Sequence, residues 1–157
     1  MLNNNEIKII GQRTENKYKD TNEALDSIAQ LLLDIGLVKD SYIKAIRKRE
    51  KTFPTGLKFE NYGIAIPHTD SEHVNSEAMV INILDKPVRF GQMGTEGLHT
   101  DVNIIVMLAI KNKEKQVPYL QALIEIFQDK EKVNILLECQ NNDIIEKTFK
   151  NYLKESM

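Results

Sequence analysis

Cysteine is nearly absent from this sequence: Cys139 is the only one among 157 residues, and tryptophan is missing altogether. A single cysteine excludes a disulfide within the chain and favours a reducing compartment such as the cytoplasm. Cys139 follows a leucine-rich stretch, and we predict that its thiol is a small buried apolar group. A chain of this length can bury about 70% of the surface it exposes when unfolded. We therefore expect one domain that needs no metal ion or disulfide for its stability.

Long apolar runs and an excess of basic charge are also lacking. No stretch approaches the roughly 18 apolar residues of a membrane-spanning helix. The first ten residues, "MLNNNEIKII", have none of the features of a signal peptide. The 21 basic and 23 acidic residues leave a net charge of −2, which offers no general basic face for nucleic acid. We expect a soluble cytoplasmic protein without a nucleic-acid partner.

Motifs that bind nucleotides or activate a serine nucleophile are missing too. The seven glycines form neither a GxxxxGK phosphate loop nor a GxGxxG turn. No GxSxG elbow marks a serine hydrolase. Nucleotide binding and serine hydrolysis therefore have no motif to support them.

What the sequence does contain is hydrophobic periodicity of two kinds. Apolar runs predict strands at residues 5–10, 63–66, 77–84, 85–90 and 102–110. Helical spacing predicts helices at residues 20–35, 40–51, 117–128, 131–139 and 142–155. Polar loops are expected at residues 11–20, 53–62 and 91–100. Because 102–110 is the most apolar strand, we expect it to be central and covered on both faces. This order predicts one α/β sandwich in which helices cover a sheet.

Local signals mark where the helices begin and end. Asp20 and Glu23 are spaced as a capping box, and Gly36 suits a C-terminal stop. Asn142 is expected to cap the last helix. On helix 117–128, four apolar side chains are expected on the buried face: Leu120, Leu123, Ile124 and Phe127.

The segment "GIAIPHTD", residues 63–70, ends a short apolar strand with Pro67 and His68. Proline fixes its own φ, lacks an N–H and pushes Ile66 toward extended geometry, so the strand cannot simply continue. His68 is therefore presented near the end of the sheet, where ligands bind in open α/β folds. A neutral imidazole is a good nucleophile near pH 7, because its ordinary pKa is about 6.5. The alternative is a structural histidine bonded to a loop carbonyl.

Two histidines and two carboxylates within "HTDSEH" make a metal site a further alternative. The spacing matches no established zinc pattern, and a third ligand would have to come from elsewhere, such as His99. His73 is more consistent with a loop or strand-edge residue, and His99 with a surface or packing residue. We expect no metal and no cofactor, and a metal-dependent hydrolase stays as a rival function.

"KREKTFPTGL" (residues 48–57), followed closely by "GIAIPHTD", resembles the fructose–mannitol-type IIA proteins of the bacterial sugar phosphotransferase system (PTS). The family pattern is an Arg-Glu pair, a Pro-Thr loop and a strand that ends in Ile-Pro-His. The resemblance spans roughly residues 5–155. It implies a single IIA domain whose mixed central sheet is covered by helices on both faces. Pro-His-Thr-Asp and residues 72–74 look most like the galactitol branch.

The resemblance implies a phosphoryl relay. A histidine-containing phosphocarrier protein would donate to His68, which would pass the group to a cysteine of a cognate IIB component. The sugar, galactitol in the branch resembled, would receive it while crossing a membrane IIC component. The rival within the same family is a regulatory IIA-like protein whose phosphorylation state controls a partner protein.

By the same resemblance, the active histidine maps onto His68 and the active-site arginine onto Arg49. Arginine can bind phosphoryl oxygens as a bidentate donor, and the Thr69 hydroxyl is a candidate phosphate contact. Without the resemblance, Arg49 would be interpreted as a solvated helix-end residue paired with Glu50. Many relatives carry a second histidine where this chain has Tyr119, so we expect a mechanism that needs only one.

Overall fold

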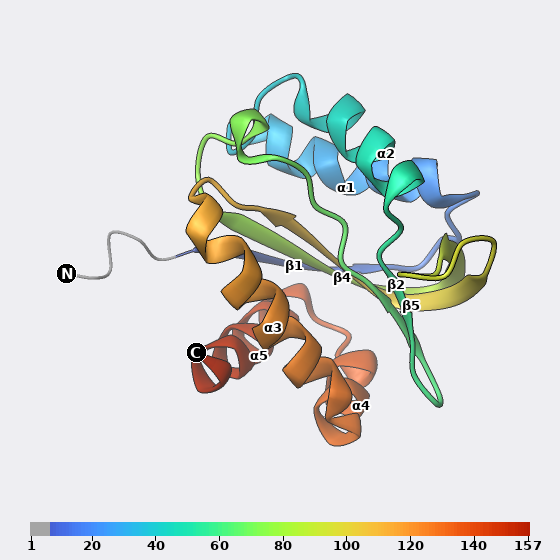
Figure 1. Cartoon of the computed structure of the whole chain (residues 1–157). Coiled ribbons are helices and arrows are strands. Elements are labelled where there is room, and N and C mark those ends of the chain that lie inside the picture. Colours follow the sequence, from blue (N-terminus) through green and yellow to red (C-terminus); the bar gives the residue numbers. More distant parts are fainter. Residues whose placement is uncertain (1–6) are drawn as a thin grey trace.

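A five-stranded mixed β-sheet forms the middle layer of the molecule (Figure 1). The computed structural model describes residues 7–157, so residues 5 and 6 of the first predicted strand and of the predicted domain lie outside the described residues. The strands are β1 (Lys8–Thr14), β2 (Gly56–Lys58), β3 (Gly63–Ala65), β4 (Ala78–Gly91) and β5 (His99–Ala109). They lie in the order β1-β4-β5-β3-β2. The pairs β1–β4 and β3–β5 are parallel, and the other two pairs are antiparallel.

Helices cover both faces of this sheet (Figure 1). One face carries α1 (Thr21–Asp34) and α2 (Tyr42–Thr52), and the other carries α3 (Gln116–Gln128), α4 (Lys130–Glu138) and α5 (Asn142–Ser156). Two short 3-10 turns, η2 (Ser71–His73) and η3 (Lys113–Lys115), lie in the connections. The predicted α/β sandwich is confirmed. No helix among residues 7–157 is long and apolar enough to cross a membrane.

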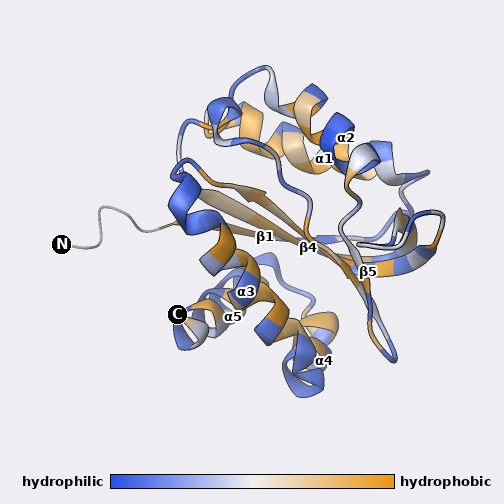
Figure 2. Ribbon diagram, in the orientation of Figure 1, coloured by the Kyte–Doolittle hydropathy of each residue, from blue (hydrophilic) through white to orange (hydrophobic). Residues whose placement is uncertain are grey.

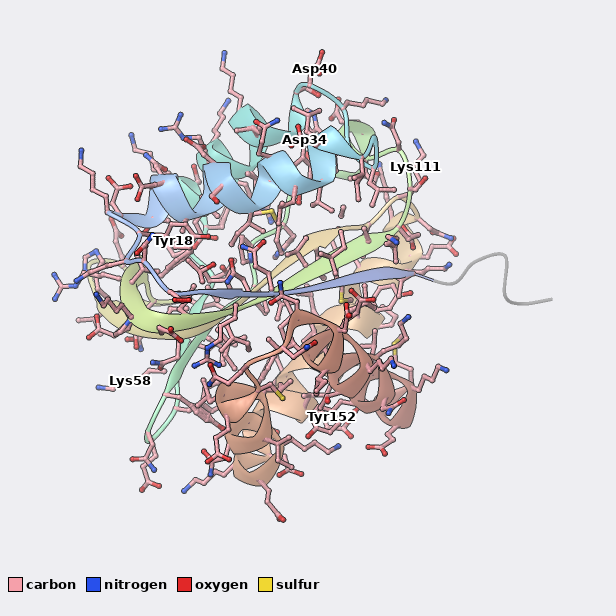
Figure 3. The ribbon with its side chains drawn as sticks, turned by 180° about the vertical axis from the view of Figure 1, so that it is seen from behind. Tyr18, Asp34, Asp40, Lys58, Lys111 and Tyr152 are labelled. Atoms are coloured by element: carbon pink, nitrogen blue, oxygen red, sulfur yellow. The ribbon has the colours of Figure 1, made fainter. Side chains whose placement is uncertain are left out.

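Strand β5 is central in the sheet, as predicted. Its side chains alternate between two cores: Ile104 and Val106 pack with α3, α4 and α5, whereas Ile105 and Met107 pack with α1 and α2. Apolar residues accordingly face the sheet from both helical layers (Figure 2). Charged side chains point outward (Figure 3), among them Asp34, Asp40 and Lys111. Because both faces of β5 are covered, its sequence is a continuous apolar run.

Several strands differ from the predicted ones. Residues 11–14, predicted as loop, continue β1 and pair in parallel with residues 81–84 of β4. Strand β4 runs unbroken through the two strands predicted at 77–84 and 85–90, with a shift in its register against β5 between Ile83 and Val88. The short β2 and the start of β5 also fall in predicted loops. Edge and bulged segments are specified by their pairing partners rather than by an apolar pattern of their own, so periodicity missed them.

Helix α1 begins and ends as predicted. Asp20 caps it by accepting the N–H of Glu23 at 2.9 Å. The carboxylate of Glu23 accepts the N–H of Lys19 at 2.7 Å. Gly36 follows the helix with a φ of 75°, the left-handed conformation that glycine adopts without a steric penalty.

The cap of α5 lies one residue before the predicted one. Asn141 is the N-cap, and its side chain accepts the N–H groups of Asp143 and Ile144. Asn142 is the first helical residue, and its side chain instead accepts the N–H of Arg13 at 2.9 Å. That long-range bond ties β1 to α5, and it explains why the local signal at two successive asparagines was misassigned.

Two predictions of burial are also wrong. Leu120 and Ile124 are only half-buried, because the buried face of α3 is rotated from the predicted one. The buried side chains of α3 are Tyr119, Ala122, Leu123, Ile126 and Phe127. Cys139 is half-buried rather than buried, and its thiol donates to the C=O of Ile135 at 3.2 Å. It follows the end of α4, at the rim of the core rather than inside it.

A hydrogen bond from α2 fixes the central strand close to the end of β3. The hydroxyl of buried Tyr42 donates to the C=O of Leu108 at 2.6 Å. The N–H of Leu108 donates in turn to the C=O of Pro67 at 3.0 Å. Both backbone polar groups of Leu108 therefore join α2, β5 and the segment that follows β3.

Replacing Tyr42 by phenylalanine should destabilise the protein by about 1–3 kcal/mol, because the buried C=O of Leu108 would lose its partner. Chemical denaturation followed by circular dichroism measures this change. Tyr152→Phe, at a half-buried tyrosine of α5, is the matched control and should change the free energy of unfolding by less than about 0.5 kcal/mol. Equal effects of the two substitutions would show that the Tyr42 hydroxyl does not hold β5.

Candidate functional site

His68 lies three residues beyond the last residue of β3, Ala65. Within the sheet β3 lies between β2 and β5, so its end is close to the middle of the molecule. The C=O of Pro67 accepts the N–H of Leu108 at 3.0 Å, which holds the chain against β5 immediately before the histidine. The His68 side chain is half-buried. The structure thus places His68 at the end of a strand, fixed by the backbone on its N-terminal side.

One hydrogen bond sets which nitrogen of the neutral His68 ring carries the proton. Nδ1 lies 2.8 Å from the C=O of Ile66. A carbonyl oxygen can only accept, so the neutral ring carries its proton on Nδ1 and leaves the lone pair of Nε2 free. The histidine does bond a loop carbonyl, as the structural alternative expected, but through one nitrogen only. The arrangement suits a nucleophile at Nε2.

Burial lowers the pKa of His68, and the positive charge of Arg49 lowers it further. The bond to Ile66 and the negative charge of Asp70 act in the opposite direction without cancelling the effect of burial. The pKa therefore lies below the ordinary value of 6.5. His68 is neutral near pH 7, which is the form that can attack.

Arg49 lies in the last turn of α2, with its guanidinium carbon 4.5 Å from the centre of the Phe53 ring. Its positive charge contributes to the lowered pKa of His68. Within residues 7–157 no carboxylate forms a salt bridge with Arg49. The interpretation of Arg49 as a surface partner of Glu50 is therefore wrong.

Glu50 points inward instead, and its exposed fraction is 5%. Its two carboxylate oxygens accept the N–H of Thr55 at 2.7 Å and the Thr55 hydroxyl at 2.8 Å. Burial raises the pKa of Glu50 to about 7, against the lowering effect of these two bonds. Glu50 and Thr55 belong to the Arg-Glu and Pro-Thr motif, from which the sequence alone predicts only a surface ion pair for Glu50 and no role for Thr55.

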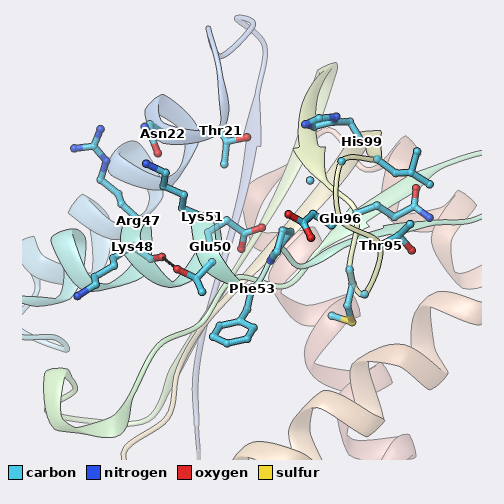
Figure 4. A pocket seen from close by; sticks show the side chains of 18 of the residues that line it. Thr21, Asn22, Arg47, Lys48, Glu50, Lys51, Phe53, Thr95, Glu96 and His99 are labelled. Carbon is cyan, nitrogen blue, oxygen red and sulfur yellow. Dashed lines mark hydrogen bonds between the residues drawn. The ribbon is translucent and has the colours of Figure 1, made fainter.

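A groove of about 1150 Å³ lies between α2 and the loop that joins β4 to β5 (Figure 4). Its cationic lining comes from α2, namely Lys44, Arg47, Lys48 and Lys51. Three exposed apolar side chains add to it: Phe53, Met93 and Leu98. Neither His68 nor Arg49 lines this groove. Glu50 connects the groove to the site, because it lines the groove while its carboxylate binds Thr55.

The three histidines do not converge. His73 bonds the Ser41 hydroxyl through Nδ1 at 2.8 Å, and His99 begins β5 and lines the groove. Within the described part of the chain, no group of three or more His, Cys, Asp or Glu side chains is arranged to hold a metal ion. The metal site considered from "HTDSEH" therefore finds no ligand set.

Two other residues named from the sequence are placed without a test of their roles. Thr69 is buried directly after His68 in the chain. Tyr119, on α3, belongs to the same apolar core as Ile66. Burial raises the pKa of Tyr119, and the negative charge of Glu77 raises it further. The phenol is therefore protonated near pH 7.

Comparison with known proteins places this geometry in a family. Residues 8–152 match the family described as phosphoenolpyruvate-dependent sugar phosphotransferase system, EIIA 2. The chain belongs to this family. Members of the EIIA 2 family are phosphotransferase components.

Two curated relatives of this chain are named for sugar alcohols. The chain is 29% identical over 139 residues to the galactitol-specific EIIA component of the PTS system of Escherichia coli, covering 88% of this chain and 91% of that one. It is 30% identical over 132 residues to the mannitol-specific phosphotransferase enzyme IIA component of Staphylococcus aureus, covering 82% and 83%. A solved complex of mannitol enzyme IIA with phosphorylated enzyme IIB from Escherichia coli has the same fold, with a TM-score of 0.70 at 22% identity and coverage of 92% and 94%.

The raised pKa of Glu50 predicts a stability that depends on pH. Between the ordinary value of 4.5 and the folded value of about 7, the folded chain holds a proton that the unfolded chain has released. The contribution of Glu50 to stability is therefore fully present below this range and is lost as the pH rises through it. Glu50→Gln cannot ionise, so its free energy of unfolding relative to the wild type should rise by up to about 3 kcal/mol across the range.

Denaturant unfolding at several pH values measures this difference. Glu72→Gln, at an exposed carboxylate, is the control and should leave the difference from wild type nearly constant. A Glu50→Gln difference that does not change with pH would show that Glu50 ionises in the folded chain as it does in the unfolded one.

Proposed function

We propose that this chain is a phosphocarrier that holds a phosphoryl group on Nε2 of His68. A histidine-containing phosphocarrier protein donates the group, and the cysteine of a cognate IIB component accepts it. The observation that carries this proposal is the bond from Nδ1 of His68 to the C=O of Ile66, which leaves Nε2 as the free nucleophile. Membership in the EIIA 2 family supports the reaction class.

The proposed chemistry requires no proton shuttle. The lone pair of Nε2 attacks the phosphorus, a P–N bond forms, and the bond to the donor histidine breaks. Nδ1 keeps its proton throughout, and the Ile66 carbonyl stabilises the positive charge that develops on the ring. When a cysteine thiolate attacks the phosphorus, the P–N bond breaks and the neutral ring leaves in its original tautomer. This scheme is consistent with Tyr119 in place of a second histidine.

Arg49 supplies the charge that the transferring group needs. Phosphoryl transfer gathers negative charge on three equatorial oxygens, and fixed donors near them lower the barrier. The guanidinium packs against Phe53 and has no salt bridge in the described chain, so its donors can turn to these oxygens. The Thr69 hydroxyl is proposed as a further phosphate contact. No metal or cofactor takes part in this scheme.

The comparisons support a IIB partner and a sugar alcohol as the final acceptor. One protein of the same fold was solved in complex with phosphorylated IIB. The galactitol-specific relative aligns over a larger share of both chains than the mannitol-specific one, so we propose galactitol as the sugar. In this role the chain works in the cytoplasm and reaches the membrane IIC component only through IIB.

His68→Gln should abolish phosphate uptake while leaving the fold intact, because the only proposed nucleophile is removed. The measurement is incubation with phosphoenolpyruvate and the general phosphotransferase proteins, followed by detection of acid-labile phosphate on this chain. His73→Gln and His99→Gln are matched controls and should label normally. Labelling of the His68→Gln protein would show that His68 is not the phosphorylated residue. Labelled wild type that passes nothing to a IIB cysteine would favour the regulatory alternative.

Arg49→Lys should slow phosphoryl transfer by about 100-fold to 1000-fold, because a point charge replaces a two-pronged donor. Rapid-quench kinetics of transfer from the phosphocarrier protein measure the rate. Arg47→Lys, on the same helix but paired with Asp26 at 3.5 Å, is the control and should transfer at the wild-type rate. If Arg49→Lys matches that control, Arg49 does not contact the phosphoryl group.

A further inference from the structure

A continuous chain of hydrogen bonds runs from Glu50 on α2 to the imidazole of His68. The Glu50 carboxylate accepts the N–H and the hydroxyl of Thr55 at 2.7 and 2.8 Å. The Thr55 Oγ1 accepts the N–H of Ile66 at 3.2 Å. The C=O of Ile66 accepts Nδ1–H of His68 at 2.8 Å. Glu50, Thr55 and Ile66 are all buried, so these bonds are shielded from water.

Ile66 needs this support because it lies beyond the pairing of its strand. The register of β3 with β5 ends at Ala65, and its register with β2 also ends there. The N–H of Ile66 therefore has no partner in the sheet, and a buried N–H without a partner is costly. Thr55, which directly precedes β2, supplies the missing acceptor with its side chain.

The carboxylate of Glu50 gives the Thr55 hydroxyl a direction. A threonine hydroxyl has one hydrogen and two lone pairs, and it can rotate freely unless the hydrogen is held. When the Glu50 carboxylate accepts the hydrogen bond from this hydroxyl, a lone pair of Oγ1 is left facing the N–H of Ile66. A protonated Glu50 would donate to Oγ1 instead, and the second lone pair would still accept the N–H of Ile66. Either form of Glu50 maintains the chain of bonds.

We propose that Glu50 and Thr55 are positioning residues that hold Ile66 and thereby fix the Nδ1–H tautomer and the orientation of the His68 ring. The carbonyl of Ile66 stays in place because the N–H of the same residue is anchored. The importance of this ring for phosphoryl transfer rests on the proposed function, whereas the tautomer itself is a property of the unmodified protein. The two can therefore be tested separately.

The main experiment compares Thr55→Val with Thr55→Ser. Valine has nearly the shape of threonine but no Oγ1, whereas serine keeps it. Nitrogen NMR reports the tautomer of the His68 ring in each protein. The ring resonances are assigned by their disappearance in His68→Gln. We expect wild type and Thr55→Ser to hold the proton on Nδ1. Thr55→Val should show a mixture of both tautomers.

Phosphate uptake gives a second readout for the same variants. The rate should fall between about twofold and tenfold in Thr55→Val, the range expected for one intramolecular hydrogen bond, and should return in Thr55→Ser. A folded Thr55→Val protein with the wild-type tautomer would overturn the proposal, whatever its rate. Absence of phosphorylation in the wild type would overturn the proposed function and leave the tautomer result standing.

A measurement on the wild-type chain covers the case in which Thr55→Val does not fold. When Glu50 changes protonation, the Thr55 hydroxyl changes from donor to acceptor in its bond with Glu50. The chemical shift of the Ile66 amide proton should therefore change with pH as Glu50 titrates. Glu50→Gln cannot titrate and should abolish this response. An Ile66 resonance that titrates identically in both proteins, or in neither, would overturn the proposal.

Control variants distinguish the effect of Glu50 on the Ile66 amide from the effects of other charged groups near this chain of hydrogen bonds. The groove that Glu50 lines also contains charges from four segments, namely Asp20, Lys44, Arg47, Lys48, Lys51, Glu96 and His99. His99→Gln removes the histidine that lines this groove, and it should leave the Ile66 response unchanged. His68 bonds Ile66 directly and is influenced by Arg49 and Asp70. His68 is still present in Glu50→Gln, so the part of the Ile66 response that disappears in that variant belongs to Glu50.

Discussion

The hydrogen bond between Nδ1 of His68 and the C=O of Ile66 is the constraint on which the candidate site depends. It decides which ring nitrogen bears the proton and which keeps its lone pair, and in the proposed relay it also stabilises the charge of the phosphorylated ring. Burial alone would lower the pKa of His68 without choosing a tautomer. Pro67, between Ile66 and His68, helps to fix this geometry because the strand cannot continue through it and its own C=O accepts the N–H of Leu108. The His68 ring is thus oriented mainly by backbone groups.

Neighbouring residues on α2 have opposite environments, and this separation gives the site its chemistry. Successive residues of a helix point about 100° apart, since one turn takes 3.6 residues. Arg49 accordingly packs on the outer Phe53 ring, whereas Glu50 enters the interior and binds Thr55. If the two had paired with each other, the arginine would be neutralised and the Thr55 loop would lose its anchor. The Arg-Glu dipeptide therefore has two separate tasks.

Much of the fold was predictable from the sequence wherever the information is local. The periodic helices, the apolar central strand and the caps at Asp20 and Gly36 depend on residues within one or two turns of each other. Errors arose where a distant partner decides, as at the second half of β1, which pairs with β4 about 70 residues away in sequence. The cap of α5 is a similar case, because Arg13 occupies the side chain of Asn142.

By itself the sequence determined the α/β class, the strand that ends at Pro67 and, through its motif, His68 and Arg49 as the candidate pair. Only the tertiary structure decided that the Glu50 carboxylate bonds Thr55 rather than Arg49, that Nδ1 of His68 bonds the Ile66 carbonyl, and that Thr55 bonds Ile66. The physical reason is that hydrogen bonds and burial depend on directions in space. Residues 50, 55, 66 and 68 are close in the chain, yet their relation is set by a helix, a loop and a strand that meet only after the sheet has formed.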